Sequence, residues 1–214
     1  MRLDHVSYVA SHDQISDVVN RIGSQIGTAF VDGGMHPKFG TRNFTAPLLN
    51  GQYIEVVCPM EHPSTDLTPF GRAVKKKAEE GGGWLTWVFS TEDISNIESK
   101  FKRSSVLGIR ARPDGTELHW KQIGVKDIAN SNEFPFFIQW LTKNHPSLDG
   151  KAVAKIKKIV ISSKNQLDNS LFNSEIKSAI SNLEIEWVNP VNTNQDTGIT
   201  EIHFKTNGSD IIIN

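Results

Sequence analysis

An internal repeat is the feature of this sequence that most limits its possible folds. When residue 5 is aligned with residue 84, the segment HVSYVASHDQISDVVNRI matches WLTWVFSTEDISNIESKF. Each segment begins as an apolar strand and continues with apolar residues at helical spacing. A fainter third copy, KKIVISSKNQLDNSLF, begins at residue 157 and aligns Gln166 and Leu167 with Gln14 and Ile15. The repeat predicts three strand–helix openings.

Three β-like segments follow each opening, which makes each unit a βαβββ module. Turn signals separate several of these segments, including Asn50-Gly51 and Asn207-Gly208. The expected strands are 28–32, 40–48 and 52–58 in the first unit, 106–112, 117–125 and 135–141 in the second, and 183–188, 199–205 and 210–213 in the third. The predicted fold class is α+β. Paired modules occupy residues 1–146, as units 1–66 and 84–146, and a third partial module occupies 151–214.

Composition and charge exclude several classes of protein. The chain has 214 residues, of which 37% are hydrophobic and 22% charged, and its net charge is -1. These values are typical of a soluble globular protein without a nucleic-acid partner. A single cysteine, Cys58, permits no intrachain disulfide, which favours a cytoplasmic location. No apolar run is long enough to span a membrane, so no membrane partner is expected.

Polar residues inside apolar strands mark the candidate site. Glu55 stands in QYIEVV, where a buried carboxylate is costly unless it is paired, hydrogen-bonded or bound to a cation. Gln139 interrupts FPFFIQWL in the second unit, and His5 begins the first strand. We expect His5 and Glu55 to converge in one hollow of the protein, because the repeated architecture brings their strands together.

Several stretches, taken in order, resemble the glyoxalase-like domain family of the vicinal oxygen chelate superfamily, which includes glyoxalase I, extradiol dioxygenases and bleomycin-resistance proteins. The matching stretches are LDHVSYV, GGMHPKFGTRNFTAPL, GQYIEVV, RPDGTELHWK and PFFIQW followed by HP, which together cover roughly residues 1–146. The resemblance implies that the sheets of two modules curl around a cleft. It also implies that metal ligands come from the first and fourth strands of each module.

Four positions match the ligand positions that the resemblance implies, and they hold His5, Glu55, Trp84 and Gln139. His5, Glu55 and Gln139 are the implied ligands of a divalent metal such as zinc, nickel, manganese or iron. Because an indole cannot coordinate a metal, Trp84 keeps a site without any cofactor open as the alternative. A remote histidine is a further candidate for the missing ligand: His36, His119 or His203.

Other residues are expected to contact a substrate. The resemblance favours His36, Thr41 and Asn43, in a glycine-rich loop leading into a strand, as a polar lip over the cleft. Arg110 and Arg112 alternate along one strand, so both face the same side, and Arg112 is expected to hold a carboxylate or phosphate. The remaining expected contacts are Trp84, Trp120 and Gln139. Solvent exposure of the arginines and core packing of the aromatic residues are the competing interpretations.

The residues leave three functions open. The first is a metal-dependent lyase or dioxygenase, in which His5 and Glu55 are catalytic and Glu55 is either a ligand or a base. The second is a metal-free protein that binds or sequesters a small aromatic or hydrophobic molecule, as bleomycin-resistance proteins do. The third is a structural homodimer with a vestigial site. Module three offers Lys157 and Ile212 at the ligand positions, so we expect it to act as a cover or a dimerisation surface.

Overall fold

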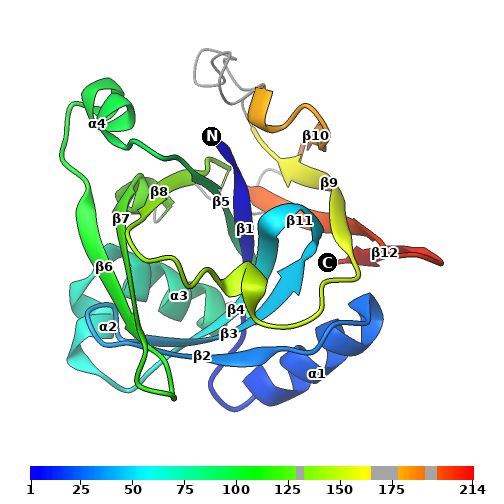
Figure 1. Ribbon diagram of the computed structural model, residues 1–214, viewed down its shortest axis with the longest axis horizontal. Helices are drawn as coiled ribbons and strands as arrows, with labels where there is room; N and C mark the ends of the chain where they lie inside the picture. Colours follow the sequence, from blue (N-terminus) through cyan, green and yellow to red (C-terminus); the bar gives the residue numbers. More distant parts are fainter. Residues whose placement is uncertain (129–132, 165–177, 191–196) are drawn as a thin grey trace.

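The strands of the first two modules close into one barrel (Figure 1). The computed structural model describes residues 1–128, 133–164, 178–190 and 197–214. Within these residues the barrel order is β1-β4-β3-β2-β6-β7-β8-β5. The strands are β1 (Arg2–Val9), β2 (Val31–His36), β3 (Thr41–Leu48), β4 (Gln52–Pro59), β5 (Gly83–Ser90), β6 (Val106–Ala111), β7 (Glu117–Ile123) and β8 (Phe136–Trp140).

The two modules repeat one pairing pattern. The first strand pairs parallel with the last strand in each module, β1 with β4 and β5 with β8, and the other pairs within a module are antiparallel. The modules then join edge to edge, through β1 with β5 and through Met35 of β2 opposite Ala111 of β6. The predicted α+β class with curled mixed sheets is confirmed. Closure means that the interior of the barrel takes the place of an open cleft.

Helices cover the outside and one end of the barrel. Helix α1 (Ile15–Ile26) buries Ile15, Ile22 and Ile26 in the cluster that also contains the outer side chains of β4, and it ends at Gly27 in a left-handed conformation. Helix α3 (Pro69–Glu79) starts at Pro69 and contributes apolar residues to the inward-facing cluster. The shorter helices are α2 (Pro63–Leu67), α4 (Ser95–Phe101), α5 (Val125–Ile128) and the 3-10 turns η1 (Leu49–Gly51) and η2 (Pro146–Leu148).

Strand β2 begins later than the sequence predicts, at Val31 rather than at residue 28. It includes Gly33 and Gly34, for which the sequence predicts a loop. Glycines weaken the β signal in a sequence, but here they permit a close approach. A Cβ atom at Gly34 would lie 1.9 Å from the carbonyl oxygen of Ala111, and Gly34 has a φ of +92°. Gly34 therefore allows β2 to meet β6 and complete the barrel.

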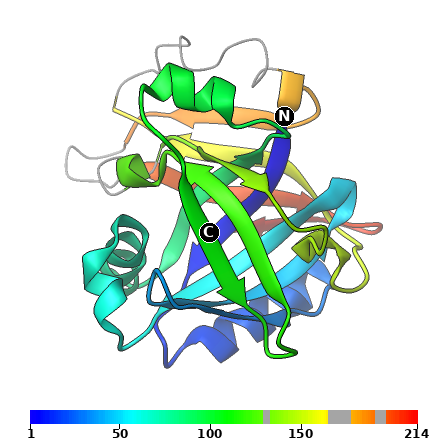
Figure 2. The ribbon, with the colours of Figure 1, turned by 60° about the vertical axis from the view of Figure 1, so that its left-hand side comes forward.

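The third module forms a separate sheet against the β1 and β5 side of the barrel (Figures 1 and 2). Its described strands are β9 (Lys155–Ser162), β10 (Glu184–Val188), β11 (Gly198–Lys205) and β12 (Asp210–Ile213), in the order β10-β9-β11-β12. The first two modules pair their last strand with their first, whereas here β10 and β11 flank β9. The expected third helix, including Gln166 and Leu167, lies outside the described residues.

No helix in the described ranges of the chain has the length and apolar character needed to cross a membrane.

Replacing Gly34 with alanine tests the closure of the barrel. We expect Gly34→Ala to lower the free energy of unfolding by about 3 kcal/mol, because it adds both backbone strain and a steric clash with Ala111. Gly115→Ala is the matched control, since Gly115 also has a positive φ of +83° but its Cβ would meet nothing within 4 Å. Urea unfolding of both variants measures the difference. Equal losses would contradict the close-approach argument.

Candidate functional site

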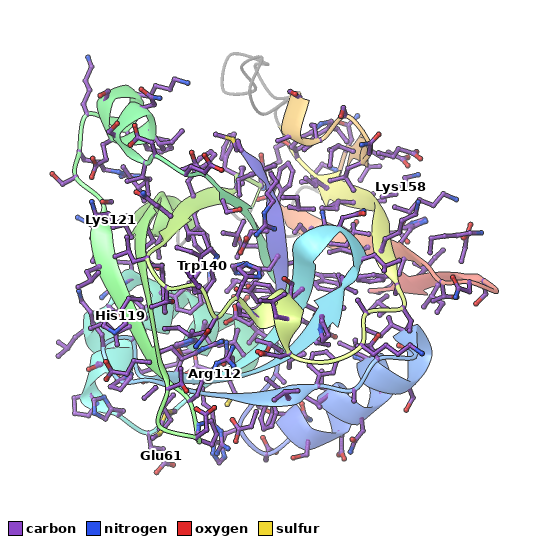
Figure 3. All side chains as sticks on the ribbon, viewed as in Figure 1. Glu61, Arg112, His119, Lys121, Trp140 and Lys158 are labelled. Carbon is purple, nitrogen blue, oxygen red and sulfur yellow. The ribbon has the colours of Figure 1, made fainter. Side chains whose placement is uncertain are left out.

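A pocket inside the barrel gathers polar groups within an aromatic wall. Its empty volume is about 440 Å³, which includes space open to solvent. The polar lining residues are His5, His36, Glu55, Arg110 and Gln122, and the apolar ones are Phe39, Tyr53, Phe70, Trp120, Phe136, Ile138 and Trp140. Figure 3 shows Trp140 within the ring of strands, whereas Lys158 lies on the outer sheet. Residues of both modules contribute to the lining.

His5 and Glu55 converge in this pocket, as the sequence predicts. Strands β1 and β4 run parallel, with His5 beside Tyr53 and Ser7 beside Glu55, so both side chains reach the same interior. The Nε2 atom of His5 lies 4.0 Å from Oε2 of Glu55. Each residue is only 5% exposed. The imidazole also stacks on the Tyr53 ring, with centroids 4.4 Å apart, which holds the plane of the histidine.

Asp4 is a central residue of the site that the sequence did not single out. The register of the pairing between β1 and β5 shifts between Leu3 and His5. This β-bulge places the side chain of Asp4 beside that of His5. Its fully buried carboxylate lies 3.0 Å from Nδ1 of His5 and 3.1 Å from Nε2 of His145. Arg2 at 3.1 Å and the Trp140 indole N–H at 3.2 Å complete its contacts.

The carboxylate of Asp4 stays ionised because its partners outweigh burial. Burial alone raises the pKa of Asp4, but hydrogen bonds from His145 and His5, and the charges of those rings, hold its pKa well below the ordinary value. An ionised carboxylate only accepts hydrogen bonds. When the His5 ring is neutral, its single N–H proton is therefore on Nδ1, which faces Asp4. The lone pair of Nε2 then faces the pocket.

Glu55 is also held as a carboxylate. Oε2 accepts a hydrogen bond from the Ser7 hydroxyl at 2.6 Å, and Oε1 accepts one from Nδ2 of Asn43 at 2.6 Å. Burial raises the pKa of Glu55, but the charges of His5 and His36 and these two hydrogen bonds lower the pKa by more than burial raises it. The net shift of the pKa is downward. Asn43 therefore positions Glu55 within the barrel and is not part of a lip over a cleft.

His36 lines the pocket as a neutral ring. Its Nδ1 lies 2.9 Å from the Thr41 hydroxyl, and the ring packs against Trp120 with centroids 5.9 Å apart. Burial, with smaller effects from the charges of Arg110 and His5, lowers the pKa of His36 to about 4, although Glu55 opposes the shift. The structure thus brings His36, Thr41 and Trp120 to the site, with Thr41 supporting the histidine.

Arg110, within β6, and Arg112, just after the end of β6, have different surroundings. Arg110 lines the pocket at 2% exposure. Arg112 instead forms a two-pronged ion pair with Asp149, at 3.0 and 2.6 Å. This pair fastens the segment that follows His145 to the barrel. The expected substrate contact of Arg112 is therefore replaced by a structural ion pair, and Arg110 takes the place at the pocket.

Trp84 and Gln139 lie away from the pocket, contrary to expectation. The Trp84 indole donates to the Ile213 carbonyl at 2.8 Å and packs near Phe204, beneath the outer sheet. The Gln139 amide donates to the Glu92 carbonyl at 2.6 Å. Strand side chains alternate between faces, so a small error in register moves a residue to the other side. The repeat alignment located the strands but not the faces of these two residues.

The remaining histidine candidates are also remote. His119 lies 3.0 Å from Glu117, and it belongs to the outer side of β7 (Figure 3). His203 lies 3.6 Å from Glu201 on the outer sheet. His145, whose Nδ1 accepts from the Ser147 backbone N–H at 3.1 Å, points its Nε2–H towards Asp4. The sequence analysis did not select His145, although the His-Pro pair at residues 145–146 belongs to the stretches that carry the family resemblance.

The donor set does not fit a divalent metal. Within the part of the chain that the structure describes, no three His, Cys, Asp or Glu side chains converge as ligands. Both oxygens of Glu55 already accept hydrogen bonds, and Gln139 lies elsewhere. The Arg110 guanidinium in the same pocket would also repel a cation. The three ligands expected from the sequence are therefore not assembled here.

A family model and several solved structures are similar to this chain. A family model described as a glyoxalase-like domain matches residues 3–171. A hypothetical protein from Staphylococcus aureus aligns with a TM-score of 0.67 and 16% identity, over 97% of this chain and 92% of that one. Methylmalonyl-CoA epimerase from Mycobacterium tuberculosis aligns with a TM-score of 0.43 and 12% identity, over 65% and 86% of the two chains. No curated protein matches the sequence.

Removing the charge of Asp4 should destabilise the folded protein. We expect Asp4→Asn to lower the free energy of unfolding at pH 7 by about 3 kcal/mol, because it breaks a buried charge network. Since the folded pKa of Asp4 is depressed, its stabilisation is present above the unfolded pKa of about 3.9 and is lost as the pH falls below that value. The difference between wild type and variant should therefore shrink in acid.

Urea unfolding at several pH values checks this expectation. Glu117→Gln is the control, because Glu117 is an exposed residue that contacts the half-buried His119, and its loss should change stability little. A gap between wild type and Asp4→Asn that stays constant down to pH 2 would contradict the assigned charge of Asp4.

The tautomer of His5 is a second expectation. Long-range ¹H–¹⁵N NMR spectra should show the neutral His5 ring protonated at Nδ1, and Asp4→Asn should lose this preference. A neutral His5 ring protonated at Nε2 in the wild type would contradict the proposed geometry.

Proposed function

The chain belongs to the glyoxalase-like domain family of the vicinal oxygen chelate superfamily. From this premise we propose that its barrel pocket binds a small molecule and transfers a proton to or from it. The observation that carries the proposal is the buried Asp4–His5 pair, with 3.0 Å between carboxylate and Nδ1. This arrangement fixes the imidazole so that Nε2 accepts a proton from the pocket.

Glu55 completes the proposed acid–base site. When Nε2 of His5 takes a proton from an acidic C–H bond next to a carbonyl group, the bonding electrons pass to the carbonyl oxygen as an enolate. The imidazolium that forms lies between two carboxylates, Asp4 at 3.0 Å and Glu55 at 4.0 Å, which stabilise its charge. Return of the proton to the enolate oxygen or to a different carbon gives an isomerised product, whereas return to the original carbon regenerates the substrate with its hydrogen exchanged.

Proton exchange with solvent deuterium tests this proposal. In D2O, the protein should accelerate the loss of the acidic C–H signal from at least one member of a panel of 2-oxo acids, hydroxyketones and 1,3-dicarbonyl compounds, followed by NMR. We expect His5→Gln to slow the exchange by about 10²–10⁴-fold. His119→Gln is the surface control and should leave the rate unchanged. An equal rate in wild type and His5→Gln would refute the role of His5.

A metal-assisted lyase or dioxygenase reaction is the competing chemistry. Because three ligands do not converge among the described residues, we expect no saturable thermal stabilisation of chelator-treated protein by zinc, nickel, manganese or iron ions. Titrations of wild type and His5→Ala, followed by thermal unfolding, provide the measurement. A metal-dependent rise in Tm that disappears in His5→Ala would restore the metal site.

Metal-free sequestration of a ligand is the second candidate function. It is favoured by the hydrogen bonds that already occupy both oxygens of Glu55, since a carboxylate held in this way serves as well to orient a ligand as to react. Ligand binding without any proton exchange would support this candidate.

The cytoplasmic location and the homodimer stay predictions. The indole of Trp84 lies beneath the sheet of module three, which supports a role for that module as a cover of its own barrel.

A further inference from the structure

Within the residues that the structure describes, Arg110 is a buried cation without a direct partner for its charge. It is 2% exposed, and its Nε and Nη2 atoms have no hydrogen-bond partner. Among the described residues it forms no ion pair. Burial lowers the pKa of Arg110, with nearby Tyr53 and Glu55 opposing the shift. An isolated buried charge is strongly unfavourable, so such a group is normally paired or bound to a ligand.

The neighbouring carboxylates are already committed to other groups. Glu55 accepts from Ser7 and Asn43, and Asp149 is held by Arg112. Of the residues that the structure describes, Arg110 is therefore left as a cation without an ion pair on the β6 side of the pocket.

The chain also makes room for this guanidinium. Gly33 of β2 lies against it, and a Cβ atom there would be 3.0 Å from Nη1 of Arg110 and 2.2 Å from Oδ1 of Asn43. Oδ1 of Asn43 is likewise buried without a partner. A larger residue at position 33 would displace both polar groups. The absence of a side chain there keeps Arg110 and Asn43 beside the pocket.

The rest of the pocket favours a flat, apolar body. Phe39, Phe70, Trp120 and Phe136 line it, and such surfaces bind planar groups through stacking and edge contacts. A doubly charged anion is disfavoured, because the pocket offers one unpaired guanidinium and Glu55 is itself a carboxylate. The complementary ligand has one negative charge and a planar apolar part.

We propose that the pocket takes a small monocarboxylate with a planar apolar body, whose carboxylate pairs with Arg110 while its other end faces His5 and Glu55. This inference rests on the proposed function, since it names the class of molecule that would occupy the same site. The guanidinium matches a carboxylate in geometry, with two parallel N–H donors. Arg110 then serves as the anchor, and His5 as the group that exchanges the proton.

Binding measurements with matched acids and amides test the anchor. Benzoate and trans-cinnamate should bind wild-type protein about tenfold or more tightly than benzamide and trans-cinnamamide, as measured by calorimetry or NMR titration. Acetate and inorganic phosphate, which lack the planar body, should bind at least as weakly as the amides. Equal binding of acids and amides, or tighter binding of phosphate, would overturn the proposal without any variant.

Two variants of neighbouring arginines sharpen the result. Arg110→Met should remove the preference for the acids, whereas Arg112→Met, which loses only the ion pair with Asp149, should keep it. Arg110→Met should also raise the Tm of the ligand-free protein, because an unpaired buried charge is replaced by an apolar chain. A lower Tm together with an unchanged preference for acids would identify Arg110 as a structural residue and overturn the proposal.

The proposal that Arg110 anchors a carboxylate and the proposal that His5 transfers a proton can be refuted independently. His5→Gln should retain the binding of benzoate while it loses proton exchange. Exchange that persists in Arg110→Met with uncharged substrates would leave the role of His5 intact, but an unchanged affinity of Arg110→Met for benzoate would overturn the anchor.

Discussion

Closure of the barrel is the constraint on which the rest of the structure depends. Neither module encloses a space alone, because each contributes a four-stranded half with two free edges. The edges meet where β1 pairs with β5 and where Gly34 lets β2 approach β6. Only after this closure do His5 and Glu55, from the first module, share an interior with Arg110 and Trp120 from the second. The site is a property of the pair of modules.

The charged groups inside the barrel differ in whether they have partners. Asp4 is surrounded by donors, and Glu55 has both oxygens hydrogen-bonded, so each carboxylate is stabilised in its ionised form despite burial. Arg112 and Asp149 neutralise each other near the end of β6. Among the described residues, Nε2 of His5 and the guanidinium of Arg110 remain open towards the pocket. Buried polar groups without partners inside the chain are the ones best placed to recognise a ligand.

The third module changes the surroundings of the barrel more than its chemistry. Its sheet packs on the outside of the barrel, where Phe204 and the carbonyl of Ile213 meet the Trp84 indole. This cover removes a large aromatic side chain from water. It also explains why a tryptophan stands where the sequence repeat matches His5: the two residues face opposite sides of their strands.

The sequence by itself determined the α+β fold class, most strand positions and the convergence of His5 with Glu55. Periodicity and turn residues are local signals, and the repeat carries them from one module to the next. The tertiary structure decided which neighbours reach the pocket. A β-bulge brings Asp4 beside His5, the register places Gln139 and Trp84 outside, and an ion pair with Asp149 leaves Arg110, not Arg112, at the site. A shift of one residue reverses the face of a strand, and such shifts depend on contacts between distant segments that no local pattern records.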